Sequence, residues 1–338
     1  MLRPKISLII VCRNEEKYIA KALHSFVCQD YPQGLTEIIV VDGNSSDETV
    51  NIAASILKDS GLQFQIIHNP HKTLATGWNL AIRAASGEFV CRIDAHGELK
   101  KDYLSRGIAI LQHLNDPNVI CIGGILENIG EGFLGKIAED LFSSVFGVGN
   151  SPFRIKANGR FYSDTAAMGI YKKSVFDEVA YFDESLDRNQ DIALHQKFRV
   201  RGLKFVTEPE MVFRYHVRST FLGLLKKAYQ DGYWVIYSGA SYARHKIPLF
   251  FFFYLCFLFF IKIIRKPLKL AFFPLQFYSA LALFFSVKDG KGISKLLLPF
   301  LFIAYHATYG FGSFVALMKP RRSGKLHPNL VVLVPDDS

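Results

Sequence analysis

A carboxylate and an imidazole stand two positions apart where a predicted strand ends. Residues 88–94 are rich in β-branched and aromatic side chains, and the stretch that closes with Asp94 and His96 is followed by Gly97, which lets the chain turn. Residues two apart on an extended chain share one face, so both side chains can reach one divalent cation, which in turn can hold a diphosphate. The same spacing also fits a strand that ends in a polar turn, and the rest of the chain has to decide between the two.

A second candidate is Asp191, an acid at the start of a helix-like pattern. Ile192, Leu194 and Phe198 recur at helical spacing, and Gly202 ends the pattern. A carboxylate here could be the general base that takes a proton from a hydroxyl group. The N-terminal end of a helix favours an acid for electrostatic reasons alone, however, and from the position by itself this second explanation is the better one.

The elements that position these residues alternate between strands and helices. Residues 6–11 form an uninterrupted apolar run, as expected for a strand buried on both faces of a parallel sheet. Further strands are predicted, with amphipathic helices between them, at residues 37–41, 64–67 and 88–94. This order predicts an α/β fold with a doubly wound, mostly parallel sheet and helices on both faces, and its ligands bind beyond the carboxyl ends of the strands.

Motifs and charge exclude several classes of protein. No Gly-x-Gly-x-x-Gly follows the first strand and no Gly-x-x-x-x-Gly-Lys-Ser/Thr occurs, which counts against a dinucleotide dehydrogenase and a P-loop NTPase. The whole formal charge of +10 comes from the residues after 240, where 13 of the 40 basic but only 3 of the 30 acidic side chains lie. These charges flank apolar runs, so they indicate a membrane rather than a nucleic acid as partner.

The cellular compartment is predicted from the cysteines and the N-terminus. The five cysteines are odd in number and include no Cys-x-x-Cys spacing, which is typical of buried thiols in a reducing compartment. Residues 1–5 lack the apolar segment of a secretory signal peptide and lead directly into the first strand. We therefore expect the first domain to stay in the cytosol.

Three uncharged apolar runs near the end of the sequence predict a membrane region. They are residues 247–261, 270–287 and 296–318. Spanning takes about 20 apolar residues, so the first run is short for a crossing. Basic residues follow the first and the third run, and three crossings would put both basic segments outside, against the positive-inside rule. We expect the first run to be re-entrant or interfacial, the other two to span, and the C-terminus to be cytosolic.

The segment before these runs is predicted to lie at the membrane surface. Residues 221–228 have an amphipathic pattern, and five aromatic residues follow between 229 and 242. Aromatic residues that pack in a core are the alternative explanation. The domains predicted from these patterns are a catalytic domain (1–218), an interfacial segment (219–246), a membrane region (247–318) and a basic, cytosolic tail (319–338).

The ordered series of motifs resembles the inverting family 2 glycosyltransferases, which have the GT-A fold. The resemblance covers residues 6 to 235, and its later motifs resemble the succinoglycan-type exopolysaccharide branch. The motifs that carry it are residues 6–11 with Arg13-Asn14-Glu15, Val40-Val41-Asp42-Gly43-Asn44-Ser45-Ser46-Asp47, Gly77-Trp78-Asn79, Arg92-Ile93-Asp94-Ala95-His96, Gly123-Gly124, Ser163-Asp164-Thr165 with Gly169, Phe182-Asp183-Glu184, and Arg188-Asn189-Gln190-Asp191.

The resemblance implies a site for a nucleotide sugar, with a UDP-sugar as donor. Asp42 would lie near the uracil or ribose, and Asp94 and His96 would take the places of the family's Asp-x-Asp acids that bind Mn²⁺ or Mg²⁺. An imidazole in the second place favours Mn²⁺, because Mg²⁺ prefers oxygen ligands. The residues that the resemblance places around the donor are Val11, Arg13, Asn14, Glu15, Asp42, Asn79, Arg92 and Asp94.

The resemblance also implies that Asp191 is the general base. Gln190 stands where many relatives have Glu, and we expect it to position the acceptor or Asp191. The Gln-x-x-Arg-Trp motif of processive synthases lacks its Arg in residues 230–234, which implies one sugar per binding event. Further polar residues stay unassigned between roles in the pocket and ordinary turn or solvated positions: Asp164, Arg160, Lys156, His216 and Arg218.

Together these features predict an inverting, metal-dependent glycosyltransferase in the cytoplasmic membrane, multi-pass, with its catalytic domain in the cytosol. It would move a sugar to a lipid-diphosphate-linked glycan in cell-surface or exopolysaccharide biosynthesis, with membrane lipids and no nucleic acid among its partners. Two alternatives are a sugar nucleotidyltransferase, which needs neither membrane runs nor an acceptor base, and a non-enzymatic membrane scaffold with a degenerate nucleotide pocket.

Overall fold

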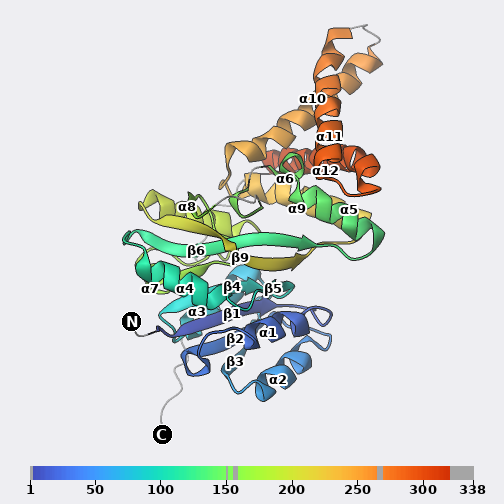
Figure 1. Cartoon of the computed structure of the whole chain (residues 1–338). Helices are drawn as coiled ribbons and strands as arrows, with labels where there is room; N and C mark the ends of the chain where they lie inside the picture. Colours follow the sequence, from blue (N-terminus) through green and yellow to red (C-terminus); the bar gives the residue numbers. More distant parts are fainter. Residues whose placement is uncertain (1–2, 150, 155–158, 265–268, 320–338) are drawn as a thin grey trace.

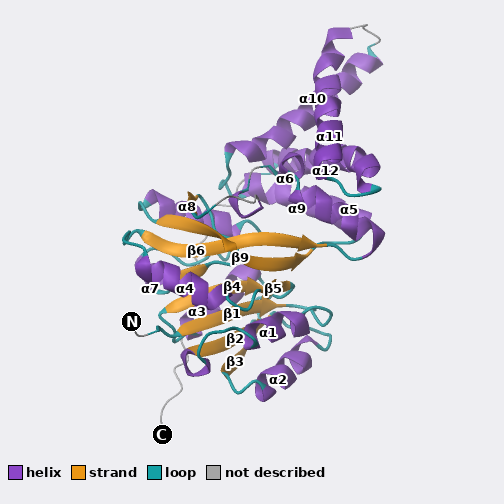
Figure 2. Ribbon diagram, viewed as in Figure 1, coloured by secondary structure: helices purple, strands orange, loops and turns teal. Residues whose placement is uncertain are grey.

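The computed structural model describes residues 3–149, 151–154, 159–264 and 269–319. In this part of the chain the strands form one mixed sheet in the order β3-β2-β1-β4-β8-β6-β9-β5, with β7 paired to β9 (Figure 2). Four neighbouring strands run parallel: β1 (Ile6–Cys12), β2 (Thr36–Asp42), β3 (Gln63–His68) and β4 (Phe89–Asp94). These are the four predicted strands, so the doubly wound, mostly parallel α/β fold is confirmed.

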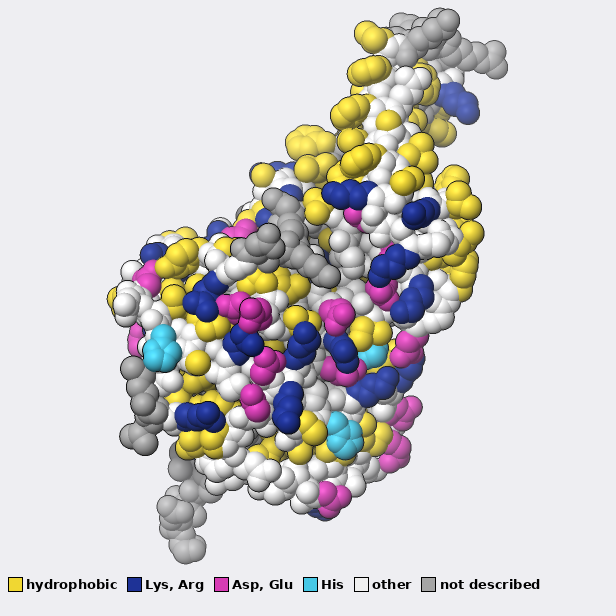
Figure 3. Space-filling view, viewed as in Figure 1, with side chains coloured by type: hydrophobic (Ala, Val, Ile, Leu, Met, Phe, Trp, Pro, Cys, Tyr) yellow, Lys and Arg dark blue, Asp and Glu magenta, His cyan; other side chains and the backbone are white. Residues whose placement is uncertain are grey.

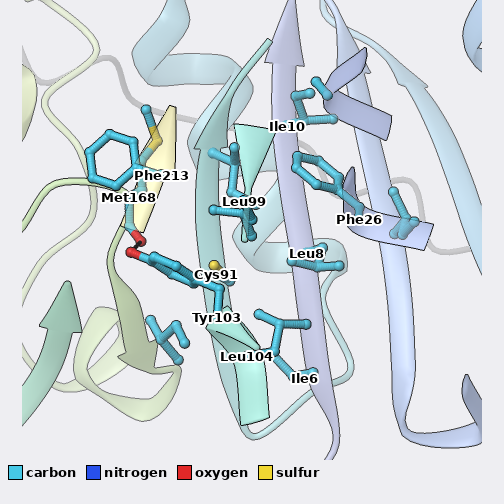
Figure 4. Close-up of a cluster of buried hydrophobic side chains, with 14 of the residues drawn as sticks. Ile6, Leu8, Ile10, Phe26, Cys91, Leu99, Tyr103, Leu104, Met168 and Phe213 are labelled. Carbon is cyan, nitrogen blue, oxygen red and sulfur yellow. Dashed lines mark hydrogen bonds between the residues drawn. The ribbon is translucent and has the colours of Figure 1, made fainter. Parts of the chain in front are cut away.

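Helices cover both faces of the parallel strands because side chains alternate along each strand. Ile6, Leu8 and Ile10 of β1 belong to one buried cluster, together with residues of the helices α1 (Ile19–Val27), α2 (Thr49–Asp59) and α4 (Tyr103–His113) (Figure 4). Ile9 and Val11 belong to the opposite cluster, with residues of α3 (Leu74–Ala84), α7 (Ser174–Glu178) and α8 (Gln190–Val200). The uninterrupted apolar run is thus explained by burial on both sides.

The far half of the sheet is built around two long strands. β6 (Val119–Ile129) and β9 (Lys204–His216) pair in parallel, and β9 also pairs with the short β5 (Gly97–Leu99) and β7 (Phe161–Ser163). β8 (Ile170–Lys172) joins the two halves, since it is antiparallel to both β4 and β6. α5 (Gly132–Ser143) and α6 (Val145–Val148) follow β6 and lead toward the C-terminal helices (Figure 1).

Four helices form the C-terminal part: α9 (Phe221–Tyr237), α10 (Ile247–Ile263), α11 (Phe273–Asp289) and α12 (Ser294–Met318). Glycines let α9 and α12 touch backbone to backbone, since a Cβ at Gly232 would lie 2.0 Å from Tyr309 O and one at Gly312 would lie 2.1 Å from Tyr229 O. The Ser313 hydroxyl donates to Gly232 O (3.0 Å). α10 and α11 project beyond this pair (Figure 1), with many apolar side chains on their surface (Figure 3).

Three helical segments of the described chain are long and apolar enough to cross a membrane. They are Ala243–Ile263, Leu270–Asp289 and Ser294–Met318. The first is 21 residues long because a 3₁₀ turn (η3, Ala243–Lys246) precedes α10, so the expectation that this run is short for a crossing is wrong. How many of the three cross stays a prediction, and the basic tail from 320 onward lies outside the described residues.

Candidate active site

The loops after β1 and β2 hold each other in place. Asn14 Oδ1 accepts from the Ser46 N–H (2.8 Å), and the Asn14 N–H donates to the Ser45 hydroxyl (2.9 Å). The Asp42 carboxylate accepts from that same Ser45 hydroxyl (2.6 Å). Asn14 has φ 54°, a left-handed conformation that Asn tolerates better than most residues. Asn14 and Asp42, both predicted at the nucleotide, therefore shape the two loops that lie beyond the strand ends.

One cavity of about 1290 Å³ lies beyond the carboxyl ends of β1 and β4. It is larger than the roughly 300–1,000 Å³ that is usual for a small-ligand site, so it has room for more than one substrate. Its lining includes eight of the eleven predicted site residues: Val11, Arg13, Glu15, Arg92, Asp94, His96, Gln190 and Asp191. Asn14, Asp42 and Asn79 are not among the lining residues.

Asp191 faces the end of β4 through an ion pair. Arg92 Nη2 lies 3.8 Å from Asp191 Oδ2, and the side chain of Arg92 is only 11% exposed. The guanidinium lies over the rings of Trp78 (5.2 Å) and Phe182 (5.7 Å). A largely buried cation that lies over two rings has little freedom to move, so Arg92 restricts where the carboxylate of Asp191 can point.

Gln190 and Asn189 fix the start of α8. Asn189 has φ 64°, and its amide donates to Ser238 Oγ (2.7 Å) and Ala240 O (2.8 Å), which ties α8 to the end of α9. The Gln190 amide donates to Asp187 O (3.2 Å). This contact stabilises the turn before the helix, and the expected role of Gln190 in positioning the acceptor or Asp191 stays a prediction.

Asp94 and His96 both line the cavity, but β4 ends at Asp94 and His96 lies in the turn that follows, so the two are not on one extended segment as the spacing predicts. His96 Nδ1 lies 3.6 Å from Glu15 Oε1, and the His96 ring packs edge-on against Tyr215 at 4.6 Å. Among the described residues, no group of three or more His, Cys, Asp or Glu side chains is arranged to hold a metal ion. Mg²⁺ at nucleotide sites is held by one or two carboxylates together with phosphate oxygens and water, so the carboxylate of Asp94 fits a metal that binds with a diphosphate, and His96 stays a predicted ligand.

Asn79 is buried away from the cavity. Its amide donates to Phe182 O (3.0 Å) and Glu184 Oε1 (2.8 Å), and its Oδ1 accepts from the Phe182 N–H (3.0 Å). The side chain thus connects α3 to residues 182–184, two segments that resembled family motifs separately. These hydrogen bonds hold Phe182, whose ring packs against Arg92, so Asn79 stabilises the position of Arg92 without lining the cavity itself.

The residues left unassigned by the sequence differ in their surroundings. Asp164 pairs with Arg244 (3.4 Å), Arg160 pairs with Glu208 (2.9 Å), and His216 contacts Glu98 (2.7 Å). Arg218 and His216 line the cavity, whereas Lys156 lies outside the described residues.

His195, which follows Asp191 by one helical turn, is buried between Thr165 Oγ1 (2.7 Å) and Tyr171 OH (2.7 Å). Burial lowers the pKa of His195 to about 3, so its imidazole stays neutral.

Several lining residues carry no signal in the sequence. Arg154 belongs to no motif and comes from a 3₁₀ turn (η2, Pro152–Arg154), and Lys227 and Asp231 come from α9, where the sequence indicated a surface segment and not a part of the site. The carboxylate of Asp231 is contacted by three side chains: Lys227 (2.8 Å), Arg188 (3.7 Å) and the Tyr305 hydroxyl (3.3 Å). Only the folded arrangement brings α9, α12 and the segment before α8 to one acid.

Comparison with known proteins identifies the family. The family described as "Glycosyl transferase family 2" matches residues 7–179, and a protein of Methanococcus voltae is 30% identical over 231 residues, which cover 67% of this chain and 71% of that protein. The chain is a family 2 glycosyltransferase. It is therefore an enzyme that transfers sugars from nucleotide sugars, and this membership decides against the nucleotidyltransferase and scaffold alternatives.

The relatives act on different acceptors. The M. voltae protein is a dolichyl N-acetyl-alpha-D-glucosaminyl phosphate 3-beta-D-2,3-diacetamido-2,3-dideoxy-beta-D-glucuronosyltransferase. A GalNAc(5)-diNAcBac-PP-undecaprenol beta-1,3-glucosyltransferase of Campylobacter jejuni is 29% identical, with 58% of this chain and 64% of that protein covered. Poly(ribitol-phosphate) beta-N-acetylglucosaminyltransferase TarS of Staphylococcus aureus is 27% identical, and the match covers 55% of this chain and 31% of TarS.

Solved structures confirm the GT-A fold of this family 2 enzyme. The mannosyltransferase PcManGT from Pyrobaculum calidifontis, in complex with GDP-Man and Mn²⁺, aligns with a TM-score of 0.58 and 18% identity over 94% of this chain and 88% of that chain. S. aureus TarS aligns with a TM-score of 0.53 and 19% identity over 92% of this chain and 55% of that chain. At such identities the likeness concerns the fold alone.

Proposed function

We propose that this glycosyltransferase is a metal-dependent, inverting enzyme that transfers one sugar per binding event from a UDP-sugar to a lipid-diphosphate-linked glycan. The observation that carries the proposal is that Asp94, His96 and Asp191 line one cavity, although Asp191 follows Asp94 by almost a hundred residues. A cation site and a base on opposite sides of one sugar are what an inverting displacement needs. Separate cavities for Asp94 and Asp191 would have argued against this mechanism.

The chemistry assigns a task to each side chain. Asp191 accepts the proton of the acceptor hydroxyl while the acceptor oxygen forms a bond to the anomeric carbon, and the bond from that carbon to the diphosphate breaks on the other side. Arg92 holds Asp191 in place. Asp94 and His96 would hold Mn²⁺, which when bound neutralises charge on the departing UDP. The imidazole supports Mn²⁺ over Mg²⁺, since nitrogen suits the softer cation.

The acceptor is proposed from the membrane part and from two relatives. The Methanococcus and Campylobacter proteins are named for dolichyl phosphate and undecaprenol diphosphate acceptors. A lipid-linked acceptor is held at the membrane surface, where the apolar helices α10 to α12 would attach this domain. We place the enzyme in the cytoplasmic membrane with residues 1–218 as a cytosolic catalytic domain, 219–246 as the interfacial segment, 247–318 as the membrane region and 319–338 as a cytosolic tail.

The test is transfer with a panel of UDP- and GDP-sugars. Membranes that contain the enzyme are incubated with each donor and Mn²⁺, and the lipid-linked products are analysed by mass spectrometry. We expect one UDP-sugar to add a single residue, and Asp191→Asn and Asp94→Asn to abolish the addition. Asp59→Asn, a change of an exposed acid at the end of α2, is the matched control. No product with any donor, or full activity of Asp191→Asn, would contradict the proposal.

A further inference from the structure

The cavity that holds the candidate catalytic residues does not end at them. Its lining continues from α8 onto the three apolar helices, with Phe250, Phe251 and Tyr254 from α10, Phe277 and Tyr278 from α11, and Tyr305, His306 and Tyr309 from α12. In Figure 1 these helices lie on the side of the sheet that α9 and α6 cover. A site for a nucleotide sugar alone would not need an aromatic wall of this length.

Aromatic and aliphatic side chains make this second region apolar and partly open. Phe251 stacks on Tyr278 with ring centroids 4.4 Å apart, which forms a fixed inner wall. Phe250 and Phe277 also line the cavity but are 68% and 60% exposed, so they lie at its mouth. An exposed apolar rim on helices that are apolar enough to enter a membrane suits a hydrocarbon chain that arrives from the bilayer.

Three cations of the lining are connected to the segment before α8 and to the apolar helices: Arg188 and Lys227 contact Asp231, which also contacts the Tyr305 hydroxyl of α12, and Arg154 and Lys227 both lie over the Phe142 ring. Eight Lys and Arg but only five Asp and Glu side chains line the cavity, so an anionic ligand is favoured. Lys227 and Arg188 share the single carboxylate of Asp231, at 2.8 and 3.7 Å. This part of the lining keeps an excess of positive charge.

Arg154 differs from the exposed cations of the lining in being withdrawn from water without an acid beside it. It lines the cavity, is half-buried, and has no ion-pair partner within the described ranges; its Nη1 donates only to Phe142 O (3.3 Å) and Asn128 Oδ1 (3.4 Å). Burial lowers the pKa of Arg154, and the raising effects of Tyr305, Tyr215 and Asp231 do not outweigh it. A guanidinium withdrawn from water without a carboxylate costs stability, and an anionic ligand would remove that cost.

We propose that this extension of the cavity binds the acceptor's isoprenyl diphosphate, with the chain along α10, α11 and α12 and the diphosphate at Arg154, beside Lys227 and Arg188. The inference rests on the proposed function, which supplies a lipid-linked acceptor, and adds the place where its lipid end is recognised. The lining combines polar, cationic and apolar parts, as such a molecule combines glycan, diphosphate and hydrocarbon. The acceptor hydroxyl would then extend toward Asp191.

Binding of geranylgeranyl diphosphate tests this assignment without a sugar donor. Full-length protein in phosphatidylcholine nanodiscs is titrated with the radiolabelled probe, and geranylgeraniol, inorganic diphosphate, UDP and phosphatidylglycerol serve as competitors. We expect geranylgeraniol and inorganic diphosphate each to compete at least about tenfold more weakly than unlabelled geranylgeranyl diphosphate, since each occupies only the apolar or only the cationic region. Displacement of the probe by UDP would place it in the donor site, and equal competition by phosphatidylglycerol would mean a general lipid site; either result overturns the inference.

Two pairs of variants locate the probe. Arg154→Gln should weaken the probe's binding about tenfold or more, because a desolvated charge pair is lost. Arg214→Gln, on β9 outside the cavity lining, is its control. Phe250→Asp should weaken binding of the probe but not of inorganic diphosphate, with Phe257→Asp, also exposed on α10 but not in the lining, as control. Retained UDP binding shows that each variant is folded, and equal effects within a pair overturn the assignment.

The two proposals fail in different ways. If geranylgeranyl diphosphate binds as described but no sugar nucleotide supports transfer, the proposed reaction is wrong and the lipid site stands. If the enzyme transfers a sugar to a lipid-linked acceptor and Arg154→Gln and Phe250→Asp leave the Michaelis constant for that acceptor unchanged, the reaction stands and the lipid site is wrong.

Discussion

Replacement of Arg92 by Met should slow transfer without weakening the binding of the donor. Arg92 contacts Asp191 at 3.8 Å and lies over the Trp78 and Phe182 rings, so its position is fixed from three sides. Met has a similar length and suits the apolar surroundings, but it cannot hold a carboxylate. We therefore expect the proposed base to lose its orientation while the donor side of the cavity stays intact.

The size of the effect follows from the geometry. At 3.8 Å and an effective dielectric constant of about 20, Coulomb's law gives about 4 kcal/mol for the pair. The Asp191 side chain is 38% exposed, and pairs screened by water contribute about 1 kcal/mol or less. The free energy of unfolding should thus change little, or even rise, since Arg92 Nε is buried without a hydrogen-bond partner among the described residues. A base displaced by about 1 Å can cost about 100-fold in rate, so we expect kcat to fall about 10- to 100-fold.

Steady-state kinetics, with the donor and acceptor that the panel identifies, tests whether Arg92 orients Asp191 or contacts the nucleotide of the donor. Arg83→Met is the matched control, since Arg83 also stacks on a ring, that of Tyr181 at 4.2 Å, but lies outside the cavity lining. In an Asp191→Asn background, Arg92→Met should have little further effect, because the two residues act as a unit. A higher Michaelis constant for the donor with unchanged kcat would refute the reasoning and support the donor contact that the family resemblance implies.

Three further predictions concern the parts that support the site. Burial raises the pKa of Glu37, but hydrogen bonds from Ser7 and Ser86 outweigh it and hold the pKa below its usual value. The stability that these bonds give should be present above about pH 4.5 and be lost as the pH falls further. In urea unfolding, the free energy of unfolding of Glu37→Gln should therefore fall less with acid than that of the unchanged protein. Asn79→Ala should lower the free energy of unfolding by about 2 kcal/mol or more and leave the donor's Michaelis constant unchanged. A reporter fused after Pro335 should be active only in the cytosol; activity in the periplasm would contradict the expected two crossings.

The parallel half of the sheet could be predicted because its signal is local. An apolar run such as residues 6–11 indicates a strand buried on both faces. The helical spacing of Ile19, Leu23 and Phe26 indicates a helix with one buried face. Asp94 and His96 could be located for the same reason, since a strand end fixes where they point. Only the family resemblance, and not the chain's own pattern, favoured Asp191 over a helix-dipole acid.

The rest of the site depends on contacts between distant segments. Nothing in the sequence around Arg154 distinguishes it from a solvated charge, and it becomes a half-buried cation only where β6, α5 and η2 meet. Asn79 was expected at the nucleotide because it lies in a motif, but its hydrogen bonds run to residues 182–184, more than a hundred positions away. A motif in the sequence therefore does not distinguish side chains that stabilise the site from side chains that contact the ligand.

The register of β4 sets how the proposed base and the proposed cation site lie relative to each other. Arg92, Asp94 and His96 are spaced by two, whereas Cys91 and Ile93 belong to the buried cluster on the opposite face. One face of β4 therefore carries both Arg92, which contacts the proposed base, and Asp94, a proposed metal ligand, while His96 lies in the turn that follows. Pairing with β1, which places Ile9 opposite Arg92 and Val11 opposite Asp94, fixes this register. A slip of one residue would put Ile93 in the cavity and a carboxylate in the core, so burial of the strand keeps Arg92 and Asp94 on the cavity side.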